Sequence, residues 1–217
     1  TNIFQLYQGG IGLGEKEYYL EDDEATKKIR DGYKAHIVKM FQLIGQDEKQ
    51  ATKSMEAVME IETRLAKKSF NAVEQRNPAA NYHMLTLDEL KKQIPGFDWD
   101  AYINAVGVKG VTSLNVSQIE PVQEAVAIIN ELPMDKQKAY LQWKLIDSAA
   151  SYLSDAFVAQ NFEFYGKVMS GKKEDQPRWK KAVGTVNGVL GEAVGQMYVE
   201  KYFPAAAKER MVQLVKN

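Results

Sequence analysis

The stretch from Pro177 to Phe203 reads as one amphipathic helix, yet it contains four glycines. They are Gly184, Gly188, Gly191 and Gly195. In a helix interior each glycine costs about 1 kcal/mol relative to alanine. A helix that keeps four of them needs a compensating reason, and close approach of a second backbone supplies one. We therefore expect Gly188 and Gly191, in the middle of the stretch, to mark a close crossing with the helix that carries Trp143 and Phe157.

Apolar side chains recur at helical spacing over most of the chain, and this predicts an all-α fold. Two long central helices should cross or run antiparallel, with minor short strands or loops between the other elements. The expected helices are residues 23–44, 47–73, a short one after Thr86, 98–106, one from Ser117 to about 131, 135–169 and 178–203, with a short strand at 111–116.

Local signals set several of these boundaries. Gly45 is placed to end the first helix, and the short turn to Asp47 predicts an antiparallel hairpin. Thr86 to Glu89 and Ser117 to Glu120 both match the capping-box pattern that opens a helix. These signals predict where helices begin and end, independently of their apolar stripes.

The chain divides by composition into an opening segment and a helical remainder. Residues 1–22 are rich in glycine and tyrosine and predict a loop or short strand, and residues 23–217 predict the helical domain. Residues 211–217 lie in an apolar-periodic stretch with no stop signal, so we expect a domain truncated at its C-terminus. The alternative is a complete small protein after processing.

Composition excludes several classes of function. The net charge is −1, which gives no general attraction to nucleic acid or to an anionic membrane surface. No apolar run approaches the roughly 20 residues that a membrane span needs, so we expect no membrane contact from this segment. The chain has no cysteine, which excludes disulfides and thiolate metal sites.

The sequence contains no recognisable catalytic, cofactor-binding or metal-binding constellation. The two histidines, His36 and His83, lie on different expected elements, and neither has a second ligand at zinc spacing. The HExxH motif is absent. His36 follows the apolar stripe of its helix, and we interpret it as a packed core residue.

Glu62 is the titratable residue that the pattern singles out, because it lies on an inward stripe between Val58 and Leu65. A buried carboxylate must be paired or neutralised. It is either a general acid or ligand, or a structural residue that ties its helix to another segment. Arg76 and Arg178 are the candidate partners for a bidentate ion pair.

Several motifs together resemble the neprilysin-like zinc endopeptidases. The run Gln8–Leu20 resembles the family's Gly-Leu-Pro-x-Arg-Asp-Tyr-Tyr stretch, although Gly14 replaces the proline and Lys16-Glu17 replaces Arg-Asp. The further matches are Glu60–Ala66, Arg76-Asn77-Pro78 followed by Tyr82 and Met84–Leu90, Trp143, Phe164-Tyr165-Gly166, Trp179-Lys180-Lys181, Val186-Asn187 and Ala193–Val199. Their order and spacing cover nearly the whole chain.

The resemblance implies that this chain is most of the helical lid domain of a zinc metalloendopeptidase. The zinc ligands and the general base would then belong to a catalytic domain outside this chain, and the lid would limit which peptides enter. The implied partners are peptide substrates and the protein's own catalytic domain, and the implied location is extracytoplasmic. By itself the chain should be inactive. The rival hypothesis is a helical protein-interaction module with no role in proteolysis.

Overall fold

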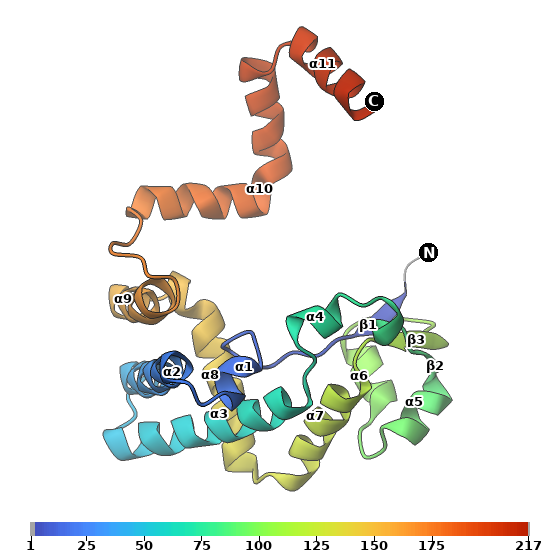
Figure 1. The fold of residues 1–217 in the computed structure, drawn as a ribbon, viewed down its shortest axis with the longest axis vertical. Helices are drawn as coiled ribbons and strands as arrows, with labels where there is room; N and C mark the ends of the chain where they lie inside the picture. Colours follow the sequence, from blue (N-terminus) through green and yellow to red (C-terminus); the bar gives the residue numbers. More distant parts are fainter. Residues whose placement is uncertain (1–2, 217) are drawn as a thin grey trace. The chain divides into compact units, whose positions relative to one another are not determined.

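The computed structural model describes residues 3–216 and confirms the expected all-α class. About 70% of the chain is helical, and the described residues contain only three short strands (Figure 1). The chain splits into two compact units, which meet in the sequence at Lys172 and Lys173. We call residues 3–172 the first unit and residues 173–216 the second unit. The expected boundary at residue 22 stays a prediction.

The first unit contains all three strands and most of the helices. Its elements are β1 (Phe4–Leu6), α1 (Glu17–Leu20), α2 (Glu24–Leu43), α3 (Glu48–Lys68), α4 (Ala72–Gln75), the 3-10 helix η1 (Ala79–Asn81), β2 (Met84–Thr86), α5 (Leu87–Gln93), α6 (Trp99–Ala105), β3 (Ser113–Val116), α7 (Ile119–Glu131), α8 (Met134–Ala149), η2 (Ala150–Tyr152), α9 (Asp155–Asn161) and the π-helix η3 (Phe162–Val168).

Helices α2 and α3 form the expected hairpin. The Asp23 carboxylate caps α2 by accepting from the backbone N–H groups of Ala25 and Thr26. At the other end Gly45 adopts φ +95°, and the N–H of Gln46 donates to the carbonyl of Phe41 at 3.2 Å. This left-handed ending satisfies carbonyls that the last helical turn leaves unpaired, and it requires glycine at Gly45.

A three-stranded sheet packs with α5, α6 and α7 into a second region of the first unit, which we call the sheet lobe. Its strand order is β1-β3-β2, with β1 parallel and β2 antiparallel to the central strand β3. Leu114 and Val116 of β3 point into a core formed with α5, α6 and α7. The Thr86 capping box is confirmed, since its hydroxyl accepts from the Glu89 N–H and the Glu89 carboxylate accepts from the Thr86 N–H.

The main core lies between α2, α3, α8 and the α9–η3 segment. Its largest fully buried side chains include Trp143, Tyr33 and Phe41. A smaller cluster of Ile61, Leu65 and Ile128 joins α3 to α7 and so connects this core to the sheet lobe. The inward stripe expected for α3 is confirmed by its buried residues.

The expected helix over residues 135–169 is wrong, because the structure breaks it at Leu153. Leu153 and Ser154 are both extended, with ψ −169° and 163°. The Ser154 carbonyl then accepts from the N–H groups of Phe157 and Val158, which begins α9. The carboxylate of Asp155 in the first turn favours this helix start, whereas the Ser154 side chain makes no capping hydrogen bond. The apolar stripe continues across this break and hides it.

Two other boundaries also differ from the expectation. The helix predicted to end near residue 73 ends at Lys68, because Ser69 is extended and Asn71 opens the separate helix α4 with its own capping box. The second predicted capping box does not form. Ser117 is buried, its hydroxyl accepts from the Asn115 amide at 3.2 Å, and α7 starts after Gln118.

The second unit consists of α10 (Arg178–Tyr202) and α11 (Ala205–Lys216), and neither helix buries a residue. Helix α10 is kinked at Leu190, where the backbone is non-helical (φ −119°, ψ 24°). Gly188 and Gly191 flank this kink, and glycines are a common cause of such bends. None of the helices between residues 3 and 216 is long and apolar enough to cross a bilayer.

Candidate functional site

Glu62 is completely buried on α3, as its position in the apolar stripe predicts. Its carboxylate accepts a hydrogen bond from the Tyr19 hydroxyl at 2.6 Å and from the Tyr33 hydroxyl at 3.0 Å. The backbone of Gly12 also hydrogen-bonds to it. The arginine partner expected from the sequence is thus replaced by two tyrosine hydroxyls and a backbone group.

The two tyrosines extend the network to other elements. The Trp143 indole N–H of α8 donates to the Tyr33 hydroxyl at 3.1 Å, and the Leu13 N–H donates to the Tyr19 hydroxyl at 3.0 Å. Glu62 therefore joins α1, α2, α3, α8 and the loop before α1. We call these residues (Gly12, Leu13, Tyr19, Tyr33, Glu62 and Trp143) the Glu62 network.

Gly12 is required by the packing of this network. A Cβ at this position would lie 1.9 Å from the Tyr33 hydroxyl oxygen and 2.8 Å from the ring carbon that carries it. No side chain fits there unless Tyr33 moves away from Glu62. The glycine-rich opening of the chain thus serves a close approach of the loop to the core.

Burial raises the pKa of Glu62, while the hydrogen bonds from Tyr19, Gly12 and Tyr33 and the charge of Lys144 oppose that rise. Burial and the neighbouring carboxylate raise the pKa of Tyr19 and of Tyr33 well above the usual value, so both hydroxyls remain donors. Because Glu62 is sealed from solvent, the geometry favours an acceptor that holds segments together rather than a catalytic acid.

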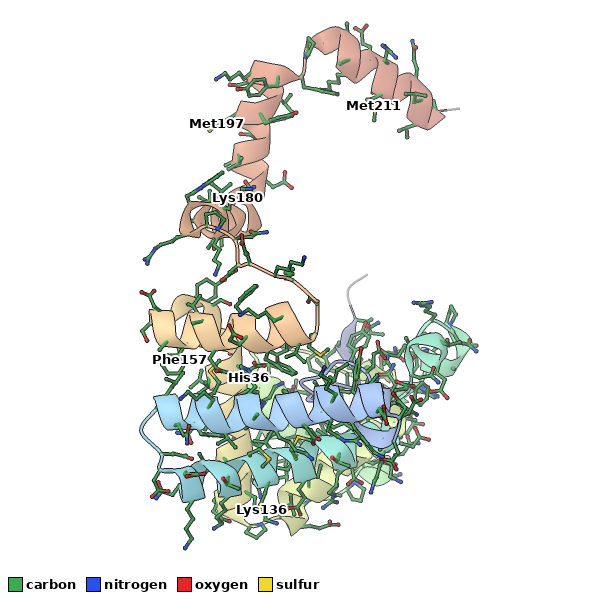
Figure 2. All side chains as sticks on the ribbon, turned by 60° about the vertical axis from the view of Figure 1, so that its left-hand side comes forward. His36, Lys136, Phe157, Lys180, Met197 and Met211 are labelled. Carbon is green, nitrogen blue, oxygen red and sulfur yellow. The ribbon has the colours of Figure 1, made fainter. Side chains whose placement is uncertain are left out.

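His36 is also buried, which confirms the expectation of a packed core residue. Figure 2 labels His36 on α2. It stacks on Phe164 with ring centroids 5.1 Å apart, and its Nδ1 lies 3.1 Å from the Gln160 amide nitrogen. Its Nε2 has no hydrogen-bond partner among the described residues. Burial lowers the pKa of His36 to about 4, so the ring is neutral at pH 7.

Of the two candidate arginines, only Arg76 lies in the first unit, and there it does not join the Glu62 network. Arg76 is an exposed residue at the C-cap of α4, and Arg178 is the first residue of α10 in the second unit. Nothing lies within 4 Å of a Cβ built on Gly188 or Gly191. A close helix crossing at these glycines therefore stays a prediction.

The first unit also carries an apolar groove of about 530 Å³ that sequence patterns did not reveal. Its walls come from the segment after β1, from α3, from the aromatic start of α6, from α7 and from α8. Phe97 and Trp99 meet edge to face at 4.8 Å in this wall. The groove is assembled from five distant segments, so no local signal marks it. Only the aromatic cluster Phe97, Trp99 and Tyr102 hints at it in the sequence.

The described residues contain no group of three or more histidine, cysteine, aspartate or glutamate side chains arranged to hold a metal ion. His36 is enclosed by aromatic rings, and the Nδ1 of His83 lies 3.0 Å from the Val116 carbonyl. The donor set of this chain therefore does not fit a zinc site.

Comparison with known families and sequences identifies the family to which the chain is similar over its whole length. The N-terminal model of peptidase family M13 matches residues 1–217. Endothelin-converting enzyme 1 from Rattus norvegicus is 26% identical over 224 residues, covering 99% of this chain and 29% of the relative. The Homo sapiens enzyme is 25% identical, with 28% of its length covered. The chain thus spans less than a third of these relatives.

Solved structures of other proteins are also similar to nearly the whole chain. The zinc metalloprotease Zmp1 of Mycobacterium tuberculosis, in complex with an inhibitor, superposes with a TM-score of 0.89 at 32% identity, covering 98% of this chain and 32% of that one. The open state of Zmp1 superposes on this chain with a TM-score of 0.87. PepO from Lactobacillus rhamnosis HN001 shares the fold, with a TM-score of 0.80 at 20% identity over 99% of this chain and 34% of that one.

Proposed function

Because the chain belongs to peptidase family M13, we propose that it is the helical lid domain of a zinc-dependent metalloendopeptidase. The observation that supports this is the match of the whole chain to about one third of a zinc metalloprotease chain. The present donor set does not fit zinc. In this proposal the zinc ligands and the general base lie in the protein's own catalytic domain, and this chain makes no bond to the metal.

The proposed role of the lid is selection by size. A rigid helical domain that faces a catalytic domain admits flexible peptides and keeps folded proteins away from the zinc. The well-packed first unit, tied by the Glu62 network across five segments, has the stiffness that such a barrier needs. We also propose an extracytoplasmic location, on family resemblance alone.

The test compares the complete polypeptide with this chain. The complete protein should cleave a short fluorogenic peptide, and a chelator should abolish that cleavage. It should leave intact the same peptide sequence when that sequence is held in a surface loop of a stable folded carrier. The chain of residues 1–217 should cleave neither.

Three outcomes would count against the proposal. Chelator-sensitive cleavage by residues 1–217 alone would place catalysis in this chain. Equal cleavage of the free and the carrier-held peptide by the complete protein would remove the role in size selection. A complete protein without peptidase activity would favour a helical interaction module.

A further inference from the structure

We propose that the free edge of β1 and the apolar groove beside it bind a peptide in extended conformation. The peptide would add a strand to β1 and place its apolar side chains in the groove. The inference rests on the proposed function in one respect, since peptides are the substrate class of that function. The site lies in this chain alone and needs no zinc.

The first argument is the direction of the backbone groups along β1. The carbonyl of Leu6 accepts from the Ser117 N–H at 2.9 Å, and the Gln8 N–H donates to the Gln118 side chain at 2.8 Å. Both therefore face the β3 side. Successive residues of an extended chain point their backbone N–H and C=O groups to opposite edges. The backbone groups of Gln5, Tyr7 and Gly9 therefore point away from β3. No described residue hydrogen-bonds to these three backbones.

The second argument is that this edge adjoins the groove. Tyr7, Gln8, Gly9 and Gly10 all line it. Gly9 has no side chain, so it lines the groove with backbone atoms alone. An unpaired strand edge at the side of an apolar groove matches the two needs of an extended peptide: main-chain partners and pockets for alternate side chains.

The third argument is the chemistry of the lining. The described residues that line the groove include no aspartate, glutamate, lysine or arginine. Tyr7, Ile129 and Leu141 leave 65%, 47% and 66% of their surface exposed. A strongly charged ligand would find no partner here. The main-chain groups at the edge favour a peptide over a purely hydrocarbon ligand. The ligand that fits is a neutral peptide with apolar side chains at alternate positions.

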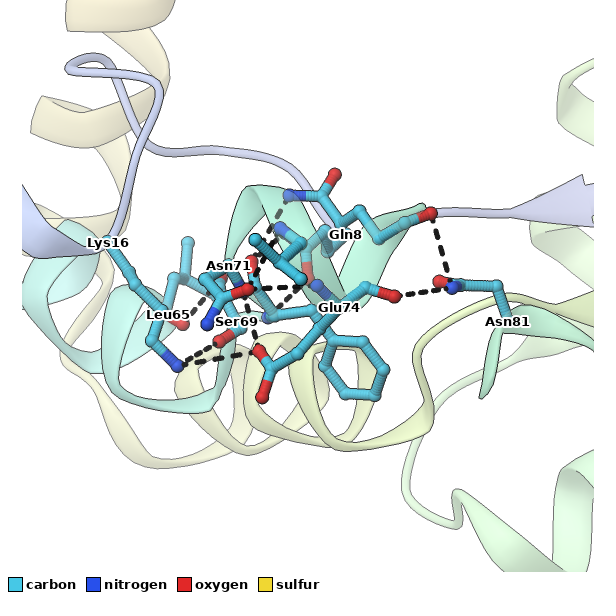
Figure 3. Close-up of polar contacts among 10 residues, drawn as sticks. Gln8, Lys16, Leu65, Ser69, Asn71, Glu74 and Asn81 are labelled. Carbon is cyan, nitrogen blue, oxygen red and sulfur yellow. Dashed lines mark hydrogen bonds and ion pairs between the residues drawn. The ribbon is translucent and has the colours of Figure 1, made fainter. Parts of the chain in front are cut away.

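The fourth argument is that the edge is held in place without a ligand. The Gln8 side-chain amide donates to the Phe70 carbonyl at 2.9 Å, and its oxygen accepts from the Phe70 N–H at 2.7 Å (Figure 3). The Tyr140 hydroxyl donates to the Gly10 carbonyl at 2.7 Å. An edge held on both sides of Gly9 loses little freedom there on binding, which favours affinity.

The test uses blocked seven-residue peptides of alternating threonine and leucine, titrated into the chain by calorimetry. Two further peptides carry N-methyl groups on alternate residues, one set on the leucines and the other on the threonines. The alternating side chains fix which residues face the groove. One set of N-methyl groups therefore removes the peptide N–H groups that point toward β1. The other set removes the peptide N–H groups that point away from β1. We expect at least a tenfold loss of affinity for one set and less than a threefold change for the other.

Two protein variants form a matched pair on α8. Leu141→Ser removes an apolar side chain from the groove wall, whereas Leu145→Ser alters an equally exposed leucine (69%) that does not line the groove. We expect Leu141→Ser to weaken binding about tenfold and Leu145→Ser to leave it unchanged. Equal effects of the two variants would overturn the site.

Further outcomes would also overturn the inference. These are no binding up to the solubility limit, equal binding of both N-methylated peptides, or a dimer of the free chain that Leu141→Ser dissociates, because a second copy would then be the occupant. Binding is measured without catalysis. A negative result here therefore leaves the size-selection test of the complete protein unaffected, and the reverse also holds.

Discussion

Residues 3–172 bury two tryptophans, two tyrosines and the Glu62 network, whereas α10 and α11 of the second unit bury no residue although they carry many apolar side chains. The two regions also use glycine differently. Gly12 is in the first unit because a neighbour leaves no room for a Cβ, whereas no residue of the second unit lies within 4 Å of a Cβ at Gly188. Apolar periodicity alone thus does not show whether a helix is already packed.

If the Glu62 network is what makes the first unit rigid, its removal should have the largest effect on stability. Glu62→Ala leaves the hydroxyls of Tyr19 and Tyr33 without their acceptor and opens a cavity, so the free energy of unfolding should fall by about 3 kcal/mol. Glu62→Gln should cost less, because its carbonyl oxygen still accepts and no charge is buried. Urea denaturation of the three proteins measures both. An unchanged midpoint for Glu62→Ala would mean that the network does not stabilise the fold.

Acid should act on the first unit through His36. Its pKa is about 4 in the folded state and about 6.5 when unfolded, so the unfolded state binds more protons between these values. The free energy of unfolding is therefore unaffected by His36 above pH 6.5. It falls by about 2–3 kcal/mol through His36 as the pH falls toward 4.

The control for this pH dependence is His36→Phe, which keeps a ring against Phe164 and removes the titration. Burial raises the pKa values of Glu62 and Asp147, and both carboxyls are present in both proteins, so their opposite contributions cancel in the difference. From pH 7 to pH 4 the melting temperature of the wild type should fall relative to that of His36→Phe, because only the wild type binds a proton at this position on unfolding. Parallel curves would show that His36 does not titrate in this range.

The two glycines give the smallest and most direct test of the comparison. Gly12→Ala should destabilise by about 1–3 kcal/mol because the methyl group displaces Tyr33. Gly188→Ala should stabilise α10 by up to about 1 kcal/mol if its surroundings are open, and should destabilise by about 1–3 kcal/mol if another helix crosses there. The sign of the change in urea denaturation decides whether another helix crosses α10 at Gly188.

The sequence predicts those features that local signals carry. The α2–α3 hairpin follows from Asp23, Gly45 and two apolar stripes, and the stripe of α3 places Glu62 inside correctly. The capping box at Thr86 also forms as predicted. In each case the determining contacts lie within a few residues along the chain.

Features that depend on distant contacts were not predictable in this way. Tyr19 lies 43 positions before Glu62 and belongs to a one-turn helix with no periodicity of its own. Ser117 matches a cap, yet its hydroxyl accepts from the Asn115 amide, and the Asn115 side chain is held by the distant backbones of Asn81 and His83. The break at Leu153 is hidden because apolar residues continue at helical spacing on both sides of it. The groove needs five segments and has no sequence signature beyond its aromatic wall.

The pairing of β1 with β3 has a consequence for how the chain folds during synthesis. Phe4 pairs with Leu114, 110 positions later in the chain. At about 5–20 residues per second, the N-terminal strand would wait on the order of 5–20 seconds for its partner to leave the ribosome. The helical hairpin needs only local contacts and forms far sooner. Strand β1 is therefore made before the hairpin but docks after it, and the unpaired strand is exposed to aggregation and to chaperones throughout that interval.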